Sequence, residues 1–302
     1  MRILHGAAAA ATLVLAVSMT ACGGSDDDAT TPPATSTVTV TAPAVPSTAG
    51  APTSSRTRTP GGPTHRTSLV AALNSAIGRA GQPVGIAIVP VGRSGRAISV
   101  GDQTPLVAWS SIKVPLAVAS QRANGQSAPQ VPAIVESDNS AAEQLWGSLG
   151  SDSDAAAAVT EVLRDGGDTT TTVPSRHLRD GFTIFGQTTW PLPNAAAFTA
   201  HLPCMAGTEH VLSLMRQVAG NQQWGVEAMT SPRSTAVKGG WGPGATSGYV
   251  VRQIGLIIHA DGSMTAVAMA TSGPSLDSGI SALNVVAQQL DKSIRKLPRG
   301  RC

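Results

Sequence analysis

The stretch Trp109-Ser110-Ser111-Ile112-Lys113 places a serine three residues before a lysine, at the start of an apolar segment that we expect to be helical over 111–123. Residues three apart on a helix lie on one face, so both side chains project from the same side of the first turn. A lysine whose charged form is disfavoured by burial accepts a serine proton, and N–H groups at a helix start stabilise an oxyanion. The stretch therefore predicts a nucleophile, Ser110, with a base, Lys113.

A serine three residues before a lysine is a weak pattern alone, and the chain contains a second copy, Ser293 to Lys296, which we expect at the surface. Two further motifs accompany the first copy in the sequence. Ser137-Asp138-Asn139 follows at the start of another predicted helix, and Lys238-Gly239-Gly240 follows about a hundred residues later. Lys113 and Lys238 are the lysines outside the C-terminal tail. Taken singly, the three elements also fit a helix cap, a turn and an exposed helix start.

Apolar spacing predicts the elements around these motifs. It indicates a first helix from about 67 to 81, strands at 84–91 and 97–101, a second strand pair at 250–259 and 264–270, and a last helix at 276–294 capped by Ser275. Helical segments at 139–148, 154–163, 194–202 and 208–218 lie between the strand pairs. The fold class is therefore α+β, with an antiparallel sheet flanked by the terminal helices and a separate helical lobe.

In this order, the three elements resemble the Ser-x-x-Lys, Ser-Asp-Asn and Lys-Thr-Gly boxes of class A β-lactamases and penicillin-binding proteins. The resemblance extends over 67–302 and implies a β-lactamase/transpeptidase-like fold with no cofactor. It implies that Ser110 attacks a peptide-like, ester or β-lactam carbonyl and forms an acyl-enzyme, that Lys113 takes its proton, and that Ser137 relays a proton to the leaving nitrogen.

The same resemblance implies which residues bind substrate. Asn139 would hold the substrate's backbone, and Lys238, with Gly240 of its box, would bind a carboxylate. Arg252, nine residues before Asp261 on a predicted strand, is a second candidate for the carboxylate, although a surface arginine on a strand is the commoner case. The implied partners are a peptidoglycan stem peptide or another acyl-D-amino acid, with β-lactams as acylating ligands.

The chain departs from the family pattern in three places. Ser110 and Ser137 are only 27 positions apart, which predicts a reduced helical lobe and a more open cleft. Gly239 stands where the family has a hydroxyl residue. In class A β-lactamases a loop glutamate activates the water that removes the acyl group, but the stretch 165–200 contains no glutamate. Asp180 is the acidic residue nearest to the place where that glutamate would be expected. We therefore expect that β-lactams acylate the protein and that the acyl group is released slowly. The alternative is a catalytically degenerate member of the same family that only binds cell-wall peptides or a protein partner.

The N-terminus predicts export. Arg2, an apolar run from 7 to 17 and small residues before Cys22 are typical of a bacterial lipoprotein signal at 1–21, although an ordinary signal with an incidental cysteine fits as well. Residues 22–66 are rich in Thr, Pro and Ser and predict a disordered tether. The domain at 67–302 would then be anchored by a lipidated Cys22 to the outer face of the cytoplasmic membrane.

Three cysteines are an odd number for an exported protein, and lipidation of Cys22 would leave Cys204 and Cys302 as a disulfide or as two free thiols. The net charge of +3 comes from scattered arginines without interleaved aromatics, so we expect no nucleic-acid partner. The six histidines are dispersed, so we expect no metal site.

Overall fold

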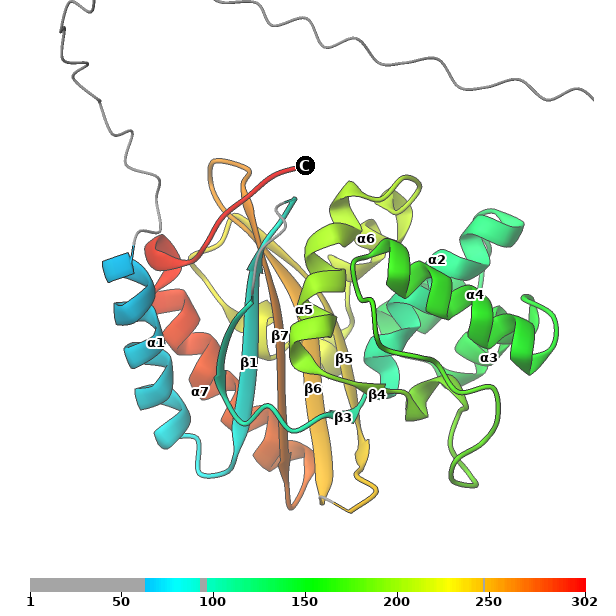
Figure 1. The fold of residues 1–302 in the computed structure, drawn as a ribbon, viewed down its shortest axis with the longest axis horizontal. Coiled ribbons are helices and arrows are strands. Elements are labelled where there is room, and N and C mark those ends of the chain that lie inside the picture. Colours follow the sequence, from blue (N-terminus) through cyan, green and yellow to red (C-terminus); the bar gives the residue numbers. More distant parts are fainter. Residues whose placement is uncertain (1–62, 93–96, 247) are drawn as a thin grey trace, which may run out of the picture. The chain divides into compact units, whose positions relative to one another are not determined.

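A computed structural model describes residues 63–92, 97–246 and 248–302 (Figure 1). The predicted signal peptide, Cys22 and nearly all of the predicted tether lie outside the described residues, as do residues 93–96 of the first predicted hairpin turn. Within the described part, no helix is long and apolar enough to cross a membrane.

The centre of the fold is an antiparallel sheet of five strands in the order β2-β1-β7-β6-β5. The register pairs Ile86 of β1 with Met269 of β7, and Gly240 of β5 with Arg252 of β6. The strands are β1 (Val84–Pro90), β2 (Ile98–Gly101), β5 (Ser234–Pro243), β6 (Tyr249–Ile258) and β7 (Met264–Gly273).

Both faces of this sheet are covered, because side chains alternate between faces along each strand. Ile86 and Ile88 of β1 belong to the cluster under α1 (Pro63–Gly78) and α7 (Leu276–Lys292). Ala87 and Val89 belong to the cluster that continues through α5 (Leu192–His201) into the helical lobe. Figure 1 shows α1 and α7 together on one side of the sheet. The predicted α+β fold is confirmed.

The helical lobe follows β2 in the chain and is joined to the sheet by a two-stranded ribbon of β3 (Leu106–Val107) and β4 (Thr189–Trp190). Its main helices are α2 (Lys113–Asn124), α3 (Asn139–Gly147), α4 (Asp152–Asp165) and α6 (Glu209–Met215). Single turns complete it at η1 (Trp109–Ile112), η2 (Pro132–Glu136), η3 (Phe185–Gln187) and η4 (Leu202–Cys204), and others lie at η5 (Gly220–Gln222), η6 (Gly225–Ala228) and η7 (Ile294–Lys296).

Two boundaries differ from the sequence prediction. α1 begins at Pro63, inside the predicted tether and before the predicted start near residue 67. The Lys238 box lies inside β5, which we had not predicted as a strand. Glycine is depleted in strands, so the sequence there resembles a turn, but ten residue pairs with β6 hold it extended.

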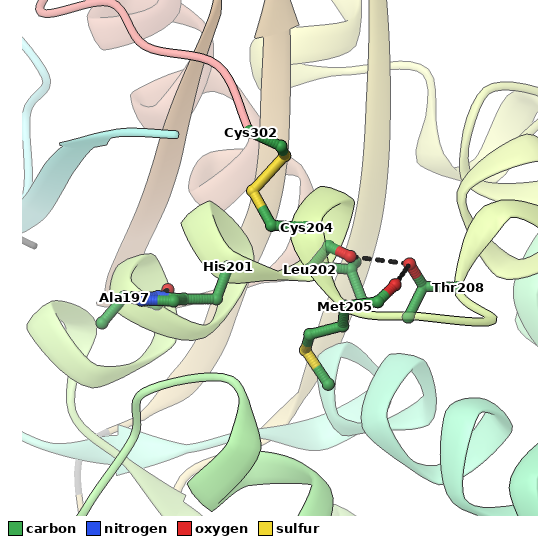
Figure 2. The surroundings of a disulfide bond; sticks show 7 residues. All are labelled: Ala197, His201, Leu202, Cys204, Met205, Thr208 and Cys302. Atoms are coloured by element: carbon green, nitrogen blue, oxygen red, sulfur yellow. Dashed lines mark hydrogen bonds between the residues drawn. A yellow bond between two sulfur atoms is a disulfide. The ribbon is translucent and has the colours of Figure 1, made fainter. Parts of the chain in front are cut away.

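The end of the chain is joined to η4 by a disulfide between Cys204 and Cys302, so the structure contains the bridge and not the free thiols (Figure 2). Gly300 exchanges two backbone hydrogen bonds with Met264, at 2.8 and 3.1 Å, which directs the last residues toward η4. There the hydroxyl of Thr208 donates to the carbonyls of Leu202 and Met205. The bridge therefore connects two segments that are each held independently.

Removal of this bridge is expected to lower stability without affecting the site. The cysteines are 98 positions apart, so the disulfide closes a long loop in the unfolded chain. Cys204→Ala with Cys302→Ala should lower the free energy of unfolding by about 2–5 kcal/mol, measured in urea without reductant. Equal stability of the parent and the double variant would contradict a structural role for the bridge.

Candidate active site

Ser110 is presented by a strained turn. Trp109 immediately before it has a φ of 46°, which is rare for a bulky residue. The Trp109 ring is held edge-on against Phe182 at 5.1 Å between centroids, and the Arg179 guanidinium lies 5.4 Å from its centre. Packing therefore fixes the turn, and Ser110 is left partly exposed at the base of α2.

Gly240 brings the Lys box against this turn. A Cβ atom at Gly240 would lie 2.7 Å from the carbonyl oxygen of Ala108 and 2.9 Å from the nitrogen of Ser110. Only glycine allows β5 to approach the nucleophile so closely. Gly240 is absent from the lining of the cavity described below and serves as a close contact between two backbones, so its predicted role in binding substrate stays a prediction.

Lys113 joins the first two boxes. Its side chain is fully buried, and its Nζ donates to the carbonyls of Ser137 and Asp138, at 2.7 and 3.1 Å, and to Oδ1 of Asn139 at 2.7 Å. Burial lowers the pKa of Lys113 to about 8. The negative charges of Asp138 and Glu143 act in the opposite direction and raise this pKa, but by less than burial lowers it. Lys113 thus has the lowered basicity that a catalytic base needs near neutral pH.

Local conformation explains why Ser137 and Asn139 reach this lysine. Ser137 adopts a left-handed conformation with φ of 64° at the end of η2, which turns the chain sharply. The Asp138 carboxylate then caps α3 by accepting from the N–H of Ala141 at 2.6 Å. Asn139 is therefore held in the first turn of α3, with its side-chain oxygen on Lys113.

Lys238 joins the second and third boxes. Its Nζ donates to Oγ of Ser137 at 2.8 Å, to Oε1 of Gln222 at 2.6 Å and to the carbonyl of Gly239 at 3.1 Å. These contacts use all three donors of a lysine ammonium. Lys238 is fully buried and contacts the Ser137 hydroxyl, and its predicted contact with a substrate carboxylate stays a prediction. Burial and the charge of Lys113 hold the pKa of Lys238 well below its ordinary value.

A cavity of about 290 Å³ lies in front of Ser110, between η1, the start of α3, the loop before η3 and the end of β5. Aromatic rings contribute much of its wall. The residues that line it are Trp109, Ser110, Asn139, Gly181, Phe182, Thr183, Trp241, Gly242, Pro243 and Tyr249. Ser110 therefore faces a space large enough for a small acyl group.

Two backbone N–H groups next to this cavity are suited to an oxyanion. One is the N–H of Ser110 at the start of the helical segment. The other is that of Trp241: N–H groups alternate in direction along a strand, and the N–H of Gly239 points away from β6 to Gln222 at 3.0 Å. The N–H of Trp241 therefore points away from β6 as well, on the side of the cavity that Trp241 lines.

Trp224 accounts for the missing hydroxyl of the Lys box. A Cβ atom at Gly239 would lie 2.8 Å from Cζ2 of Trp224, whose ring is almost fully buried. Thr235 does not replace that hydroxyl, because its side chain donates to the Glu227 carboxylate. The indole of Trp224 thus occupies the space that a threonine or serine at 239 would need.

Arg252 is not part of the site, which corrects the prediction that it binds a carboxylate. It is 1% exposed, and its Nη1 donates to the carbonyls of Leu106, Val107 and Trp190 at 3.0–3.2 Å. Its guanidinium also lies 5.5 Å from the centre of the Trp190 ring. Arg252 points from β6 into the junction of β3 and β4, so it holds the ribbon that leads to the nucleophile.

Arg252→Met is therefore expected to act on stability. The variant leaves three buried carbonyls without their donor, so the free energy of unfolding should fall by about 3 kcal/mol in urea titration. Arg233→Met, at an exposed position next to β5, is the matched control and should change little. An unchanged stability with a raised KM for carboxylate substrates would instead restore Arg252 to the binding site.

The structure thus brings together the boxes of Ser110, Ser137 and Lys238, excludes Arg252, and adds Gln222 as a support of Lys238. Sequence inspection missed Gln222 because no local pattern marks it. Within the described residues, no group of three or more potential ligands for a metal ion is found.

Comparisons with known proteins agree with this architecture. No protein-family profile and no curated protein matches the sequence. Among solved structures, PBP-A matches with a TM-score of 0.59 and 21% identity over 76% of this chain and 97% of its own. A β-lactamase from Burkholderia vietnamiensis matches with a TM-score of 0.56 and 20% identity over 74% and 95%, and one from Sphaerobacter thermophilus DSM 20745 with 0.55 and 19% over 75% and 97%.

The chain has the β-lactamase fold. At these identities the similarity establishes the fold and carries no activity over to this chain. In the β-lactamase fold of this chain, the three boxes lie on η1 and the start of α2, before α3, and on β5. The predicted similarity to class A β-lactamases and penicillin-binding proteins is confirmed at the level of the fold.

Proposed function

We propose that this protein is an exported, lipid-anchored serine hydrolase that forms an acyl-enzyme on Ser110. The observation that carries the proposal is the continuous set of contacts from Lys113 through Asn139 and Ser137 to Lys238, beside a cavity lined by Ser110. A module that only binds ligands has little need for a serine with a buried lysine of lowered pKa beside it.

In the proposed acylation, neutral Lys113 takes the proton of Ser110 as Oγ bonds to the substrate carbonyl. The negative charge on the carbonyl oxygen is held by the N–H groups of Ser110 and Trp241. The carbon–nitrogen or carbon–oxygen bond then breaks, and Ser137, oriented by Lys238, relays to the leaving atom the proton that Lys113 took, so that Lys113 is neutral and Ser137 a hydroxyl again. A neutral amine has two donors and one lone pair, so one of the three contacts of Lys113 opens toward Ser110.

We propose an acyl-D-amino acid, a stem peptide of peptidoglycan or a related ester as substrate, and β-lactams as acylating ligands. The similarity of the fold to β-lactamases and PBP-A supports this chemical class. This site offers fewer groups to bind a substrate carboxylate than the family pattern does, because Gly239 lacks a hydroxyl and Arg252 is turned inward. Those two observations favour the second candidate, a degenerate member that binds cell-wall peptides or a protein partner.

The two candidates are separated by incubating the lipid-free chain, residues 23–302, with a reporter penicillin and measuring its intact mass. An added mass equal to the penicillin, or its release as the opened acid, is expected for the hydrolase. A protein that stays unlabelled by penicillins and aryl esters, yet binds a stem peptide in calorimetry, would be the degenerate binder.

A further inference from the structure

The loop from α4 to β4 walls the site but offers it no base. Gly181, Phe182 and Thr183 of this loop line the cavity, and Gln187 holds them in place by donating to the carbonyls of Phe182 and Thr183. Asp180 is exposed, does not line the cavity and is not among the charges that act on Lys113. A base for deacylation, if present, comes from another element.

Glu143 of α3 does not line the cavity but lies one helical turn beyond Asn139, which does. It follows Asn139 by four positions, so the two lie on one face of α3, one turn apart. Asn139 lines the cavity and contacts Lys113, and Glu143 interacts electrostatically with Lys113 from the next turn. On its other side, Glu143 interacts with His177, which belongs to the loop and contacts the carbonyl of Phe182. Glu143 thus interacts electrostatically both with the buried lysine and with the loop.

The other acidic groups near Glu143 are already engaged. Asp138 caps α3 through the N–H of Ala141, and Asp152 accepts from the indole of Trp146 at 2.7 Å. Asp168 accepts from the indole of Trp190 at 2.8 Å inside the loop. In the described part of the chain, by contrast, no hydrogen bond holds the Glu143 carboxylate. It is therefore an acid with a free acceptor.

The surroundings of Glu143 suit proton transfer. Burial on one side raises the pKa of Glu143, assisted by Asp152 and opposed by His177 and Lys113, so its basicity is greater than that of an exposed glutamate. The residue is also exposed at the surface of α3, so water reaches it. Both properties are needed by a group that activates water.

We propose that Glu143 is the general base that activates water for deacylation of the Ser110 acyl-enzyme. This rests on the proposed hydrolase function. The carboxylate takes a proton from water as the water oxygen bonds to the acyl carbon. The bond from that carbon to Oγ of Ser110 then breaks, the acid product leaves, and the proton returns to Oγ through Lys113, so that Glu143 and Ser110 regain their starting forms.

The test uses the lipid-free chain and a chromogenic cephalosporin. The rate of acylation and the lifetime of the acyl-enzyme are measured separately. Glu143→Gln keeps the shape of the side chain and removes the base, so the lifetime of the acyl-enzyme should lengthen by about 10²-fold or more while the acylation rate changes by less than about threefold. Glu161→Gln, at an exposed position of α4, is the matched control and should leave both rates unchanged. Glu143→Asp should give an intermediate lifetime.

The outcomes distinguish this proposal from the function on which it rests. Equal acyl-enzyme lifetimes in the parent and Glu143→Gln would overturn the role of Glu143 and leave the hydrolase standing. If Glu143→Gln lowered only the acylation rate and shifted its pH profile, the proposed role of Glu143 as a base would also be overturned. Glu143 would then act only through the charge of Lys113. If the parent forms neither adduct nor product, the proposed function fails and the inference fails with it.

Discussion

Ser110→Ala is expected to abolish covalent labelling by a reporter penicillin and to lower kcat/KM for any acyl substrate by about 10⁴-fold or more. The variant removes the atom that bonds to the substrate and leaves Lys113, Ser137 and Lys238 in their contacts with one another. Ser110 is partly exposed, so its truncation should cost little stability. Intact mass with and without the penicillin measures the effect.

Ser293→Ala is the matched control for this variant, because Ser293 also precedes a lysine by three residues. The prediction that the second copy lies at the surface is wrong for its serine: Ser293, at the end of α7, is 4% exposed and accepts from Gln289 at 3.0 Å, although it does not line the cavity. Labelling should be unchanged. Equal labelling of the parent and Ser110→Ala would show that another group is acylated, and the mechanism would have to be abandoned.

Lys113→Ala is expected to lower the acylation rate by about 10²–10⁴-fold and to remove its dependence on pH near neutrality. The pKa of Lys113 is lowered to about 8, and only its neutral form accepts the proton of Ser110. Below that pKa the parent's acylation rate should therefore rise by about tenfold per pH unit, and above it the rate should level off. Stopped-flow labelling from pH 5.5 to 9.5 measures the profile.

Lys296→Ala, in the second copy of the pattern, should leave this profile unchanged, because Lys296 lies on η7. Lys113→Ala exposes three acceptors inside the site, so thermal unfolding must first show that the variant is folded at the assay temperature. A parent whose acylation rate is independent of pH through 8, or a Lys113→Ala variant with the parental rate, would exclude lysine as the base.

Some elements were predictable because the signal is local. The last helix has a serine at its start, and Ser275 indeed caps α7 by accepting from the N–H of Ser278. Apolar segments next to predicted turns indicated β1, β6 and β7. β5 escaped prediction because its glycines, needed for close approach to Ser110 and Trp224, also weaken the strand pattern.

The sequence by itself determined the class of fold, the order of the three boxes and the identity of the serine and two lysines, since residues close in sequence carry those signals. Only the tertiary structure decided that Arg252 supports β3 and β4, that Lys238 reaches Gln222 and Ser137, and that Glu143 interacts electrostatically with Lys113. These relations join elements far apart in the chain. They depend on how β6, α3 and the loop before β4 pack, and no local pattern records that packing.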